Sequence, residues 1–509
     1  MEKFYKIFET KVAKDIDNYI ITNNNISSLE LMDRASKVWT DKFLDIFSKD
    51  SPIVVVAGKG NNGGDGYVIA RKLKKLGFRV SVYCINTDGE MSSDCEHNKR
   101  RYELMGGTLI NISKISDFTP SKNSVIVDAI FGSGLNRAVE GLASEVIKKI
   151  NELTLTVVSV DIPSGLMGED NSKNDNSSII KADYTFTFMY PKLAFLFSEN
   201  VDYIGEWCIL DLGYEISGMN DVYTNYHYLK KNNIMDILPI PQRFAHKGIN
   251  GKGLLVAGKV GMMGAALLAS RAALRSGLGH LTCHIPSVCS NIIQLGAPEA
   301  VLDFDELEYF SEVKDLDRFD AIAVGSGIGK EPKTVKALKQ LLQNWKGRII
   351  IDADALNIIS ENKEMFSLLH KGCILTPHIK EFERLVGKCA NDFERLKKLT
   401  KFAADKKVYV VLKGAFSTVA TPEGLCYFNT SGNPGMATAG AGDVLTGVLL
   451  AMIACGMTTF EAVISGVFAH GLSGDLAVKE CGMRGLCAGV IADGMGKAWK
   501  ILEERPLVR

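Results

Sequence analysis

The sequence predicts an α/β protein with two domains, each built around a largely parallel sheet. The first observation is length, because 509 residues exceed what one hydrophobic core supports and domains usually hold about 100–200 residues. The second is a repeated order of short apolar run, glycine or polar residue and helical pattern, which is typical of parallel βαβ units. The third is a polar, irregular stretch at residues 213–241 between two such regions. We therefore place the domain junction near residue 225, between one domain at 1–225 and another at 226–509.

The N-terminal domain is predicted to be a doubly wound sheet over residues 51–212. A helical segment at 26–47 precedes it, with apolar spacing suited to packing on a sheet. Strands are predicted at 52–58, 78–85, 124–132, 156–165 and 182–190. A helix at 67–76 joins the first two of these strands. In open parallel sheets, ligands bind where the carboxyl ends of the strands meet polar loops, so the site should lie there.

The C-terminal domain repeats the α/β pattern with a small-residue helix at 264–277. Strands are predicted at 253–259, 321–327, 347–354, 372–378 and 408–414. A hairpin is expected at 416–424, on the side where a nucleotide would bind, and the last third of the domain is mostly helical in pattern.

Composition excludes several classes of partner. The 59 basic residues balance 59 acidic ones, so no net field draws the chain to nucleic acid or to a membrane surface. Eleven scattered cysteines without a CxxC pair argue against a zinc site or a disulfide framework, and they fit a reducing cytoplasm. No signal peptide and no membrane span are predicted. We expect small-molecule partners and a homo-oligomer whose number of subunits the sequence does not reveal.

The first glycine-rich run is GKGNNGGDG at Gly58 to Gly66. Its GxGxxG pattern follows a strand, which alone would suggest a dinucleotide fold, but the next strand ends at Asn86 without the ribose-binding acid. Asp65, expected in the loop, would repel a pyrophosphate. The amide and carboxylate oxygens of the run suit sugar hydroxyls or a hard cation instead. The alternative is a polar turn that caps the following helix.

Two further strands end in polar motifs, DAIFGSGLNR from Asp128 and DIPSGL from Asp161. Together with GKGNNGGDG, these motifs resemble the N-terminal epimerase domain of the NAD(P)H-hydrate repair enzymes, over residues 10–215. The resemblance implies a Rossmann-like fold and a site for the hydrated nucleotide. The implied substrate-binding residues are Asn61, Asn62, Gly63, Gly64, Asp65, Gly132, Ser133, Gly134, Leu135, Asn136, Arg137, Ala138 and Asp161. It also implies that Asn62, Asp128 and Ser164 ligate potassium, and Asp161 is the carboxylate best placed for acid–base catalysis at C6.

The second glycine-rich run is NPGMATAGAGDVLTG at Asn433 to Gly447. Glycines before a helix that starts at about Asp443 would point backbone N–H groups and the helix dipole at an anion. Phosphoryl transfer to a hydroxyl needs such donors and a carboxylate that takes the hydroxyl proton. The alternative, Asp443 as a simple N-cap, accounts for a GD pair but not for the whole run. No Walker pattern occurs, which argues against P-loop enzymes.

The GAGD run is similar to that of ribokinase-like enzymes. The longer run NPGMATAGAGD, together with LTPHIKEFERL and GKVGMMGAALLAS, resembles the ADP- or ATP-dependent NAD(P)H-hydrate dehydratases over residues 235–505. The resemblance implies a ribokinase-like α/β/α domain with Asp443 as its catalytic base. It implies contacts to the hydrated nucleotide from Ala265, Gly327, His378 and Asp443, and to ADP from Lys413, Gly414, Ala415, Phe416, Ser417 and Gly442. The family commonly has HPGE where this chain has His378 to Glu381, and Ala441 replaces a frequent hydroxyl residue.

The resemblance implies a bifunctional enzyme that repairs hydrated NADH and NADPH (NADHX and NADPHX). The N-terminal domain epimerises the R and S hydrates, and the C-terminal domain dehydrates the S form with ADP and Mg²⁺, releasing AMP and phosphate. Two alternatives stay open. One is a ribokinase-class vitamin or sugar kinase, and the other is a first domain that only binds, without catalysis. The preference between the two hydrates, and between ADP and ATP, stays open.

Overall fold

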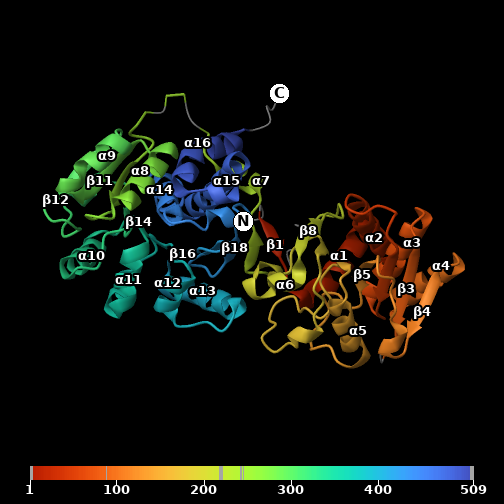
Figure 1. Cartoon of the computed structure of the whole chain (residues 1–509). Coiled ribbons are helices and arrows are strands. Elements are labelled where there is room, and N and C mark those ends of the chain that lie inside the picture. The colour runs from red at the N-terminus through yellow and green to blue at the C-terminus, as the bar shows by residue number, and fades with distance from the viewer. Residues whose placement is uncertain (1–3, 87–88, 217–221, 241–242, 245, 505–509) are drawn as a thin grey trace. The chain divides into compact units, whose positions relative to one another are not determined.

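The computed structural model describes residues 4–86, 89–216, 222–240, 243–244 and 246–504, which form two compact units (Figure 1). The N-terminal unit consists of Lys6–Thr224 with Asn391–Phe393. The C-terminal unit consists of Asn225–Ala390 and Glu394–Arg509, together with the first residues up to Tyr5. The chain passes between the units within the short strand β1 (Tyr5–Ile7). Each unit is described separately below.

The N-terminal unit contains a seven-stranded parallel sheet in the order β4-β3-β2-β5-β6-β7-β8. Its strands are β2 (Ile53–Ala57), β3 (Val80–Ile85), β4 (Thr108–Ile112), β5 (Val125–Ala129), β6 (Thr156–Val160), β7 (Tyr184–Phe188) and β8 (Glu206–Leu210). The five predicted strands are present. The two edge strands β4 and β8 were not predicted; the apolar residues of β4 are interrupted by Asn111, and the apolar run of β8 is only four residues long and is mostly half-exposed.

The helices of this unit cover the sheet on both faces. They are α1 (Ala13–Asn24), α2 (Ser28–Leu44), α3 (Asn61–Lys75), α4 (Ser93–Leu104), α5 (Gly141–Glu152) and α6 (Val201–Ile204). The helix predicted at 26–47 is α2, which begins with a capping box between Ser27 and Glu30. The start predicted for α3 is wrong: the helix begins at Asn61, six residues before the expected Tyr67. The predicted loop residues from Asn61 to Asp65 are therefore its first turns.

Close packing explains why glycines occupy the start of α3 despite their low helix propensity. A Cβ atom on Gly63 would lie 2.1 Å from the carbonyl oxygen of Gly58, and one on Gly66 would lie 2.7 Å from Cβ of Ala129. Only glycine lets the helix lie this close to the loop and to β5. The sequence pattern showed the glycines but not the tertiary contacts that require them.

In the C-terminal unit the sheet runs β9-β18-β17-β16-β15-β14-β13-β10-β11-β12. The bounds are β9 (Tyr226–Tyr228), β10 (Lys252–Val256), β11 (His280–Pro286), β12 (Val301–Asp305), β13 (Ala321–Val324), β14 (Arg348–Ile351), β15 (Cys373–Leu375), β16 (Tyr409–Leu412), β17 (Thr418–Ala420) and β18 (Cys426–Phe428). All neighbours in this order are parallel except that β17 is antiparallel to β16 and β18. A hairpin was predicted at 416–424; the observed hairpin contains β17 inside that range, but its second strand, β18, begins beyond it at Cys426. The region expected to be irregular contains β9 and a helix, because both elements are too short to show a period.

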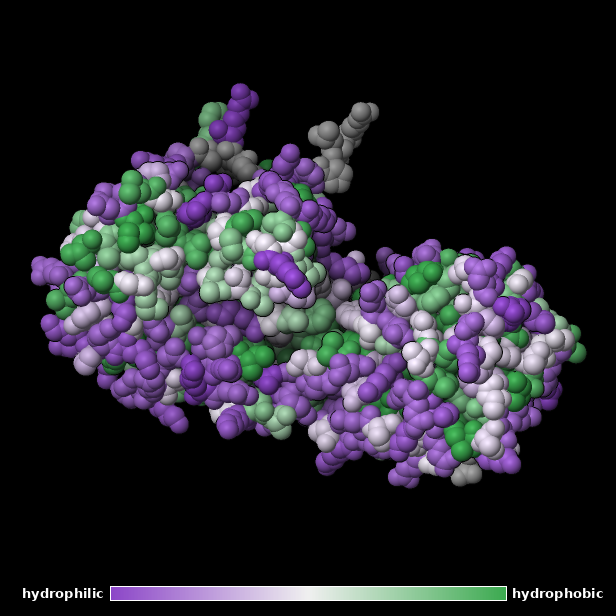
Figure 2. Space-filling model, in the orientation of Figure 1, coloured by the Kyte–Doolittle hydropathy of each residue, from purple (hydrophilic) through white to green (hydrophobic). Residues whose placement is uncertain are grey.

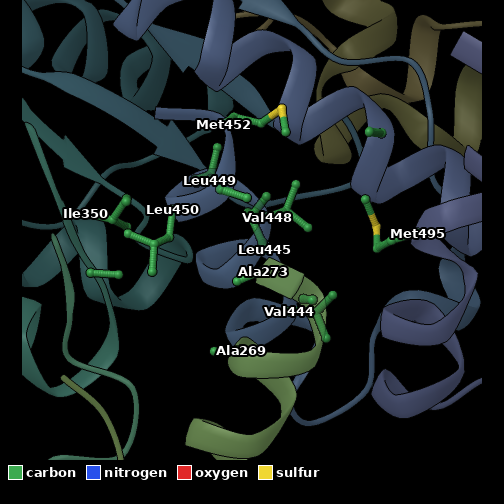
Figure 3. Packing of buried hydrophobic residues seen from close by; sticks show 14 of the residues in the cluster. Ala269, Ala273, Ile350, Val444, Leu445, Val448, Leu449, Leu450, Met452 and Met495 are labelled. Atoms are coloured by element: carbon green, nitrogen blue, oxygen red, sulfur yellow. The ribbon is translucent and has the colours of Figure 1, made fainter. Parts of the chain in front are cut away.

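The helices of this unit are α7 (Lys231–Ile237), α8 (Met263–Arg275), α9 (Ser290–Gly296), α10 (Pro332–Asn344), α11 (Ala353–Glu361), α12 (Ile379–Val386), α13 (Asp392–Lys406), α14 (Ala441–Ala454), α15 (Thr459–Gly485) and α16 (Ala488–Glu503). Figure 3 shows Ala269 and Ala273 of α8 beside Val444 and Val448 of α14. A Cβ atom on Gly447 would lie 2.1 Å from the carbonyl oxygen of Ala269, so α8 and α14 touch backbone to backbone. This contact fixes the helix that follows the second glycine-rich run.

A buried histidine links the outermost two strands at one edge of this sheet. His284 of β11 lies between Asp303 (Nδ1 to Oδ2 2.9 Å) and Asp305 (Nε2 to Oδ2 3.4 Å) of β12. Burial lowers the pKa of His284, but the two aspartates outweigh burial and raise it above its ordinary value. Figure 2 shows apolar residues on the face that includes α9 and β12. Leu295 of α9 and Phe304 of β12 are among the exposed large apolar residues of the described chain.

Among the described residues, none of the helices combines the length and the apolar character that a membrane crossing requires.

Candidate active sites

In the N-terminal unit, two of the three residues predicted to ligate potassium bond to the backbone of Phe131, and the third, Asp128, bonds to one of them. The amide of Asn62 donates to the Phe131 carbonyl (3.0 Å), and the Ser164 hydroxyl accepts from the Phe131 N–H (2.9 Å). The same hydroxyl donates to the carboxylate of Asp128 (2.5 Å). Residues that are 102 positions apart in the chain thus form one cluster at the carboxyl ends of β5 and β6, with the first turn of α3 beside them.

Asp128 is fully buried and its carboxylate is held by hydrogen bonds. The Ser159 hydroxyl and the Ser164 N–H each donate to Oδ2 at 2.8 Å. Burial raises the pKa of Asp128, and these donors partly offset the rise. The cluster therefore offers hydroxyl, amide and carbonyl oxygens around one buried carboxyl group. The described parts of the chain contain no group of three or more acidic, histidine or cysteine residues that could hold a metal ion.

Asp161 directly follows β6 and has a left-handed backbone, with φ of 66°. This conformation is uncommon outside glycine and is typical of functional positions. Its Oδ1 atom accepts hydrogen bonds from the Lys192 ammonium (2.8 Å), the Thr187 hydroxyl (3.0 Å) and the Phe188 N–H (3.2 Å). Lys192 is itself buried, with 3% of its side chain exposed, so the pair is shielded from solvent.

Sequence reasoning missed Lys192 and a second acidic residue near Asp161. Lys192 follows the strand 182–190, so its place after a strand end was the available signal. Asp17, on α1, interacts electrostatically with both Asp161 and Lys192. Nearby protein atoms that displace water and repulsion from Asp161 raise the pKa of Asp17 to about 6, against the opposing effect of Lys192, although the Asp17 side chain itself is exposed. Nothing in the local sequence of α1 distinguishes Asp17 from the other polar residues of this helix.

Asp65 lies in the second turn of α3, where its Oδ1 atom accepts from the Ser36 hydroxyl (3.2 Å). Burial raises the pKa of Asp65 well above its ordinary value, and the charges of Asp161 and Asp17 add to the rise. The predicted loop from Gly132 to Ala138 meets the cluster only at its start. A Cβ atom on Gly132 would lie 3.2 Å from Cβ of Asn62, while residues 133–138 continue along a partly exposed loop.

In the C-terminal unit, α14 begins at Ala441 after Gly440, whose φ is 91°. Asp443 lies in its first turn, as expected, although the helix starts two residues earlier than predicted. A Cβ atom on Gly442 would lie 3.2 Å from Nζ of Lys413, so the lysine ammonium lies close against the first turn of the helix. Lys413 follows β16 and its backbone N–H donates to the carbonyl of Pro377 (2.9 Å).

Lys413 forms an ion pair with Asp352, which sequence reasoning did not single out. Its Nζ atom lies 2.9 Å from Oδ1 of Asp352, and the Thr446 hydroxyl donates to Oδ2 (2.8 Å). Burial opposes the charge of Lys413, but nearby carboxylates outweigh it and raise the pKa of the ammonium. Burial also raises the pKa of Asp443 to about 6; Asp352 adds to the rise, while Ser326 and Lys413 oppose it.

The other predicted residues of this unit fall into three places. Ala265 and Gly327 are neighbours, because a Cβ atom on Gly327 would lie 3.3 Å from Cβ of Ala265. His378 caps α12: its Nδ1 atom accepts from the backbone N–H of Lys380 (3.1 Å) and Glu381 (3.3 Å). It also pairs with Lys413 through an isolated β-bridge. Residues 414–417 form the partly exposed turn between β16 and β17.

Comparison with known proteins identifies the family. The bifunctional NAD(P)H-hydrate repair enzyme Nnr of Moorella thermoacetica is 34% identical over 470 residues, which cover 89% of this chain and 88% of the relative. The enzyme of the same name from Thermofilum pendens is 33% identical over 524 residues, covering 98% of this chain and 97% of the relative. The chain belongs to the bifunctional NAD(P)H-hydrate repair enzymes. This confirms the resemblance inferred from the two glycine-rich runs and their companion motifs.

Family profiles match the two parts of this repair enzyme in order. The profile described as YjeF-related protein N-terminus matches residues 28–194, and the NAD(P)H-hydrate dehydratase profile matches residues 253–494. A solved structure, the ADP/ATP-dependent NAD(P)H-hydrate dehydratase from Bacillus subtilis co-crystallized with ATP/Mg²⁺, is 31% identical; the match covers 54% of this chain and 98% of that chain, with a TM-score of 0.47. The strand orders of the two sheets, together with the two family profiles, confirm the predicted fold class, a Rossmann-like N-terminal sheet and a ribokinase-like C-terminal domain.

Proposed function

We propose that this chain restores hydrated NADH and NADPH in two steps. Residues 1–225 interconvert the R and S hydrates at C6, and residues 226–509 dehydrate the S hydrate with ADP, giving NAD(P)H, AMP and phosphate. The observation that carries the proposal is the start of α14, where Asp443, with its pKa of about 6, stands at a helix N-terminus beside the Lys413–Asp352 pair. Relatives that match nearly the whole chain carry the name of this repair enzyme.

Dehydration needs a better leaving group than hydroxide, and phosphorylation of the C6 hydroxyl provides one. Asp443 takes the hydroxyl proton as the oxygen attacks the β-phosphorus of ADP and the bond to the AMP oxygen breaks. The unpaired N–H groups at the start of α14 and the Lys413 ammonium stabilise the charge on the moving phosphoryl group. The C6–O bond then breaks, phosphate leaves, and loss of a proton from the ring restores the reduced nicotinamide.

Mg²⁺ is proposed to accompany the nucleotide. The residues present fit a cation that arrives with the phosphates, because Mg²⁺ keeps several waters and needs only one or two protein carboxylates. When bound, it would neutralise charge on the phosphate oxygens. The contacts proposed for ADP are Lys413 to Ser417 and Gly442, and those for the hydrate are Ala265, Gly327, His378 and Asp443. Gly442 and Lys413 are neighbours in the structure, which supports a shared phosphate contact.

In the epimerase site, Asp161 is the proposed acid–base group. All three of its hydrogen bonds go to Oδ1, so Oδ2 is the oxygen that can exchange a proton with the hydrate. The proposed substrate contacts are the run from Asn61 to Asp65, the loop from Gly132 to Ala138, and Asp161. Potassium is proposed at Asn62, Asp128 and Ser164. These oxygens fit a large, weakly hydrated cation, whose charge would help to hold the ligand near the buried carboxyl group of Asp128.

One assay tests both halves. A mixture of R and S hydrates is incubated with the protein, ADP and Mg²⁺, and the absorbance of reduced nicotinamide is followed. Full recovery is expected. If nothing is recovered, the whole proposal is wrong. If recovery stops when the S form is consumed, the chain lacks the epimerase activity.

The kinase alternative is not favoured, since a vitamin or sugar kinase would not need the first domain's acidic site. Thermal-shift screening with thiazole alcohols and pyridoxal would detect a kinase through stabilisation by its own acceptor. A cytoplasmic location and a homo-oligomeric state remain parts of the proposal; the scattered cysteines support the first.

A further inference from the structure

The segment that leads into the proposed phosphate site is held from one side by α15. We call residues 432–440 the approach segment, because they connect β18 to the start of α14. Asp475 of α15 accepts a hydrogen bond at each carboxylate oxygen: the Gly432 N–H donates to Oδ2 (2.8 Å), and the Asn433 side-chain amide donates to Oδ1 (2.9 Å). Both oxygens of one carboxylate are therefore used to hold the first two residues of the segment.

The face of α15 toward the approach segment is made of small residues. A Cβ atom on Gly471 would lie 2.3 Å from Oγ of Ser431, and one on Gly474 would lie 2.3 Å from Sδ of Met436. The Ser431 hydroxyl also donates to the carbonyl of Phe468 (2.7 Å). The spacing of Phe468, Gly471 and Gly474 places them on one side of the helix. The segment thus rests directly on the α15 backbone, with Asp475 as the charged group that fixes it.

Asn433 connects Asp475 to the next residues of the approach segment. While its amide nitrogen donates to Asp475, its Oδ1 atom accepts from the Gly435 N–H (3.1 Å) and so caps the turn at Pro434–Met436. The segment then reaches Gly440, whose left-handed backbone starts α14. The direction of the N–H groups at the start of α14 depends on where this segment enters the helix.

We propose that Asp475 is a positioning residue for the phosphate site. Through its hydrogen bonds to Gly432 and Asn433 it determines the path of the approach segment, and the segment in turn determines the direction in which the α14 N–H groups point toward the nucleotide. This inference rests on the proposed dehydratase function. Asp475 acts at the start of the segment, 32 positions after Asp443 in sequence, and serves the reaction through backbone geometry rather than by contact with the reacting atoms.

The test compares Asp475→Asn with Asn433→Ala in the full-length chain. An amide at 475 keeps the size of the side chain but presents an NH₂ group to one of the two donors. Loss of a charge-assisted hydrogen bond corresponds to about 10- to 100-fold, and we expect kcat/KM for ADP to fall by that factor. Because the two variants share the hydrogen bond between Asn433 and Asp475, the double variant should lose less than the product of the two single losses.

Two controls separate positioning from general stability. Glu480→Gln changes another carboxylate of α15, which forms an exposed ion pair with Lys497, and it should leave both activities unchanged. The epimerase rate of each variant, measured in the same sample, should also stay at the wild-type value. The melting temperature is recorded for every variant.

The inference is overturned if Asp475→Asn and Asn433→Ala both keep kcat/KM for ADP within twofold of wild type, or if the variants lose both activities in parallel. If Asp475→Asn does not fold, Asn433→Ala alone decides between these outcomes. If the wild-type chain itself does not dehydrate the S hydrate, the proposed function is wrong. In that case the affinity for ADP, measured by calorimetry, tests whether Asp475 positions the phosphate site. Equal affinity in the wild type and in Asp475→Asn overturns the inference.

Discussion

The pH dependence of dehydration is expected to report the protonation of Asp443. Burial and the neighbouring Asp352 raise the pKa of its carboxyl group to about 6. A base with this pKa is about 90% ionised at pH 7 and about 10% ionised at pH 5. The rate of dehydration should therefore fall about tenfold between these two pH values. An unperturbed aspartate, with a pKa near 4, would lose only about a tenth of its ionised form over the same range.

The assay uses purified S hydrate at saturating ADP and Mg²⁺, with initial rates taken from the absorbance of reduced nicotinamide at half-unit steps of pH. Epimerisation in the same buffers provides a control for acid damage to the protein. A dehydration rate that stays flat from pH 7 to pH 5 would refute the assignment of Asp443 as the base.

Three further outcomes are expected. Asp443→Asn should slow dehydration by about 10²–10⁴-fold, or about 3–5 kcal/mol, while epimerisation continues, and Asp161→Asn should do the reverse in the same two assays. Because the charges of Asp17 and Asp161 repel each other, Asp17→Asn should change the pH dependence of epimerisation without affecting dehydration; an unchanged epimerase pH profile would remove Asp17 from the site. The raised pKa of His284 stabilises the fold below the unfolded pKa, and this contribution is lost as pH rises through the folded pKa. Urea titration should thus show that His284→Gln lowers the free energy of unfolding more at pH 6 than at pH 9. An equal decrease at the two pH values would contradict the raised pKa of His284.

The sequence predicted the parallel sheets and most residues of the two clusters, because buried parallel strands are continuous apolar runs and their ends carry the polar motifs. The sequence did not predict the features that depend on contacts between residues far apart in the chain. Asn61 begins α3 although glycines follow it, since close packing outweighs helix propensity. Lys192 and Asp352 form ion pairs with residues 31 and 61 positions away, at 2.8 and 2.9 Å, and no local pattern contains that information. Edge strands such as β12 were missed because half-exposed strands lack a continuous apolar run.

The two proposed sites share an arrangement although their folds differ. In each, an aspartate after a strand is paired with a buried or partly buried lysine, Asp161 with Lys192 and Asp352 with Lys413. In each, a second aspartate interacts with that pair and has its pKa raised to about 6, Asp17 in one unit and Asp443 in the other. The lysine partly offsets the rise in both cases. A carboxyl group with a pKa near 6 can both give and take a proton close to neutral pH, which one with an ordinary pKa does poorly. Both proposed reactions start at the C6 hydroxyl of the same hydrate, where a proton must be moved. In the C-terminal unit the aspartate with the raised pKa is itself the proposed base, whereas in the N-terminal unit the proposed acid–base group is Asp161 and Asp17 is a second carboxyl group that interacts with it.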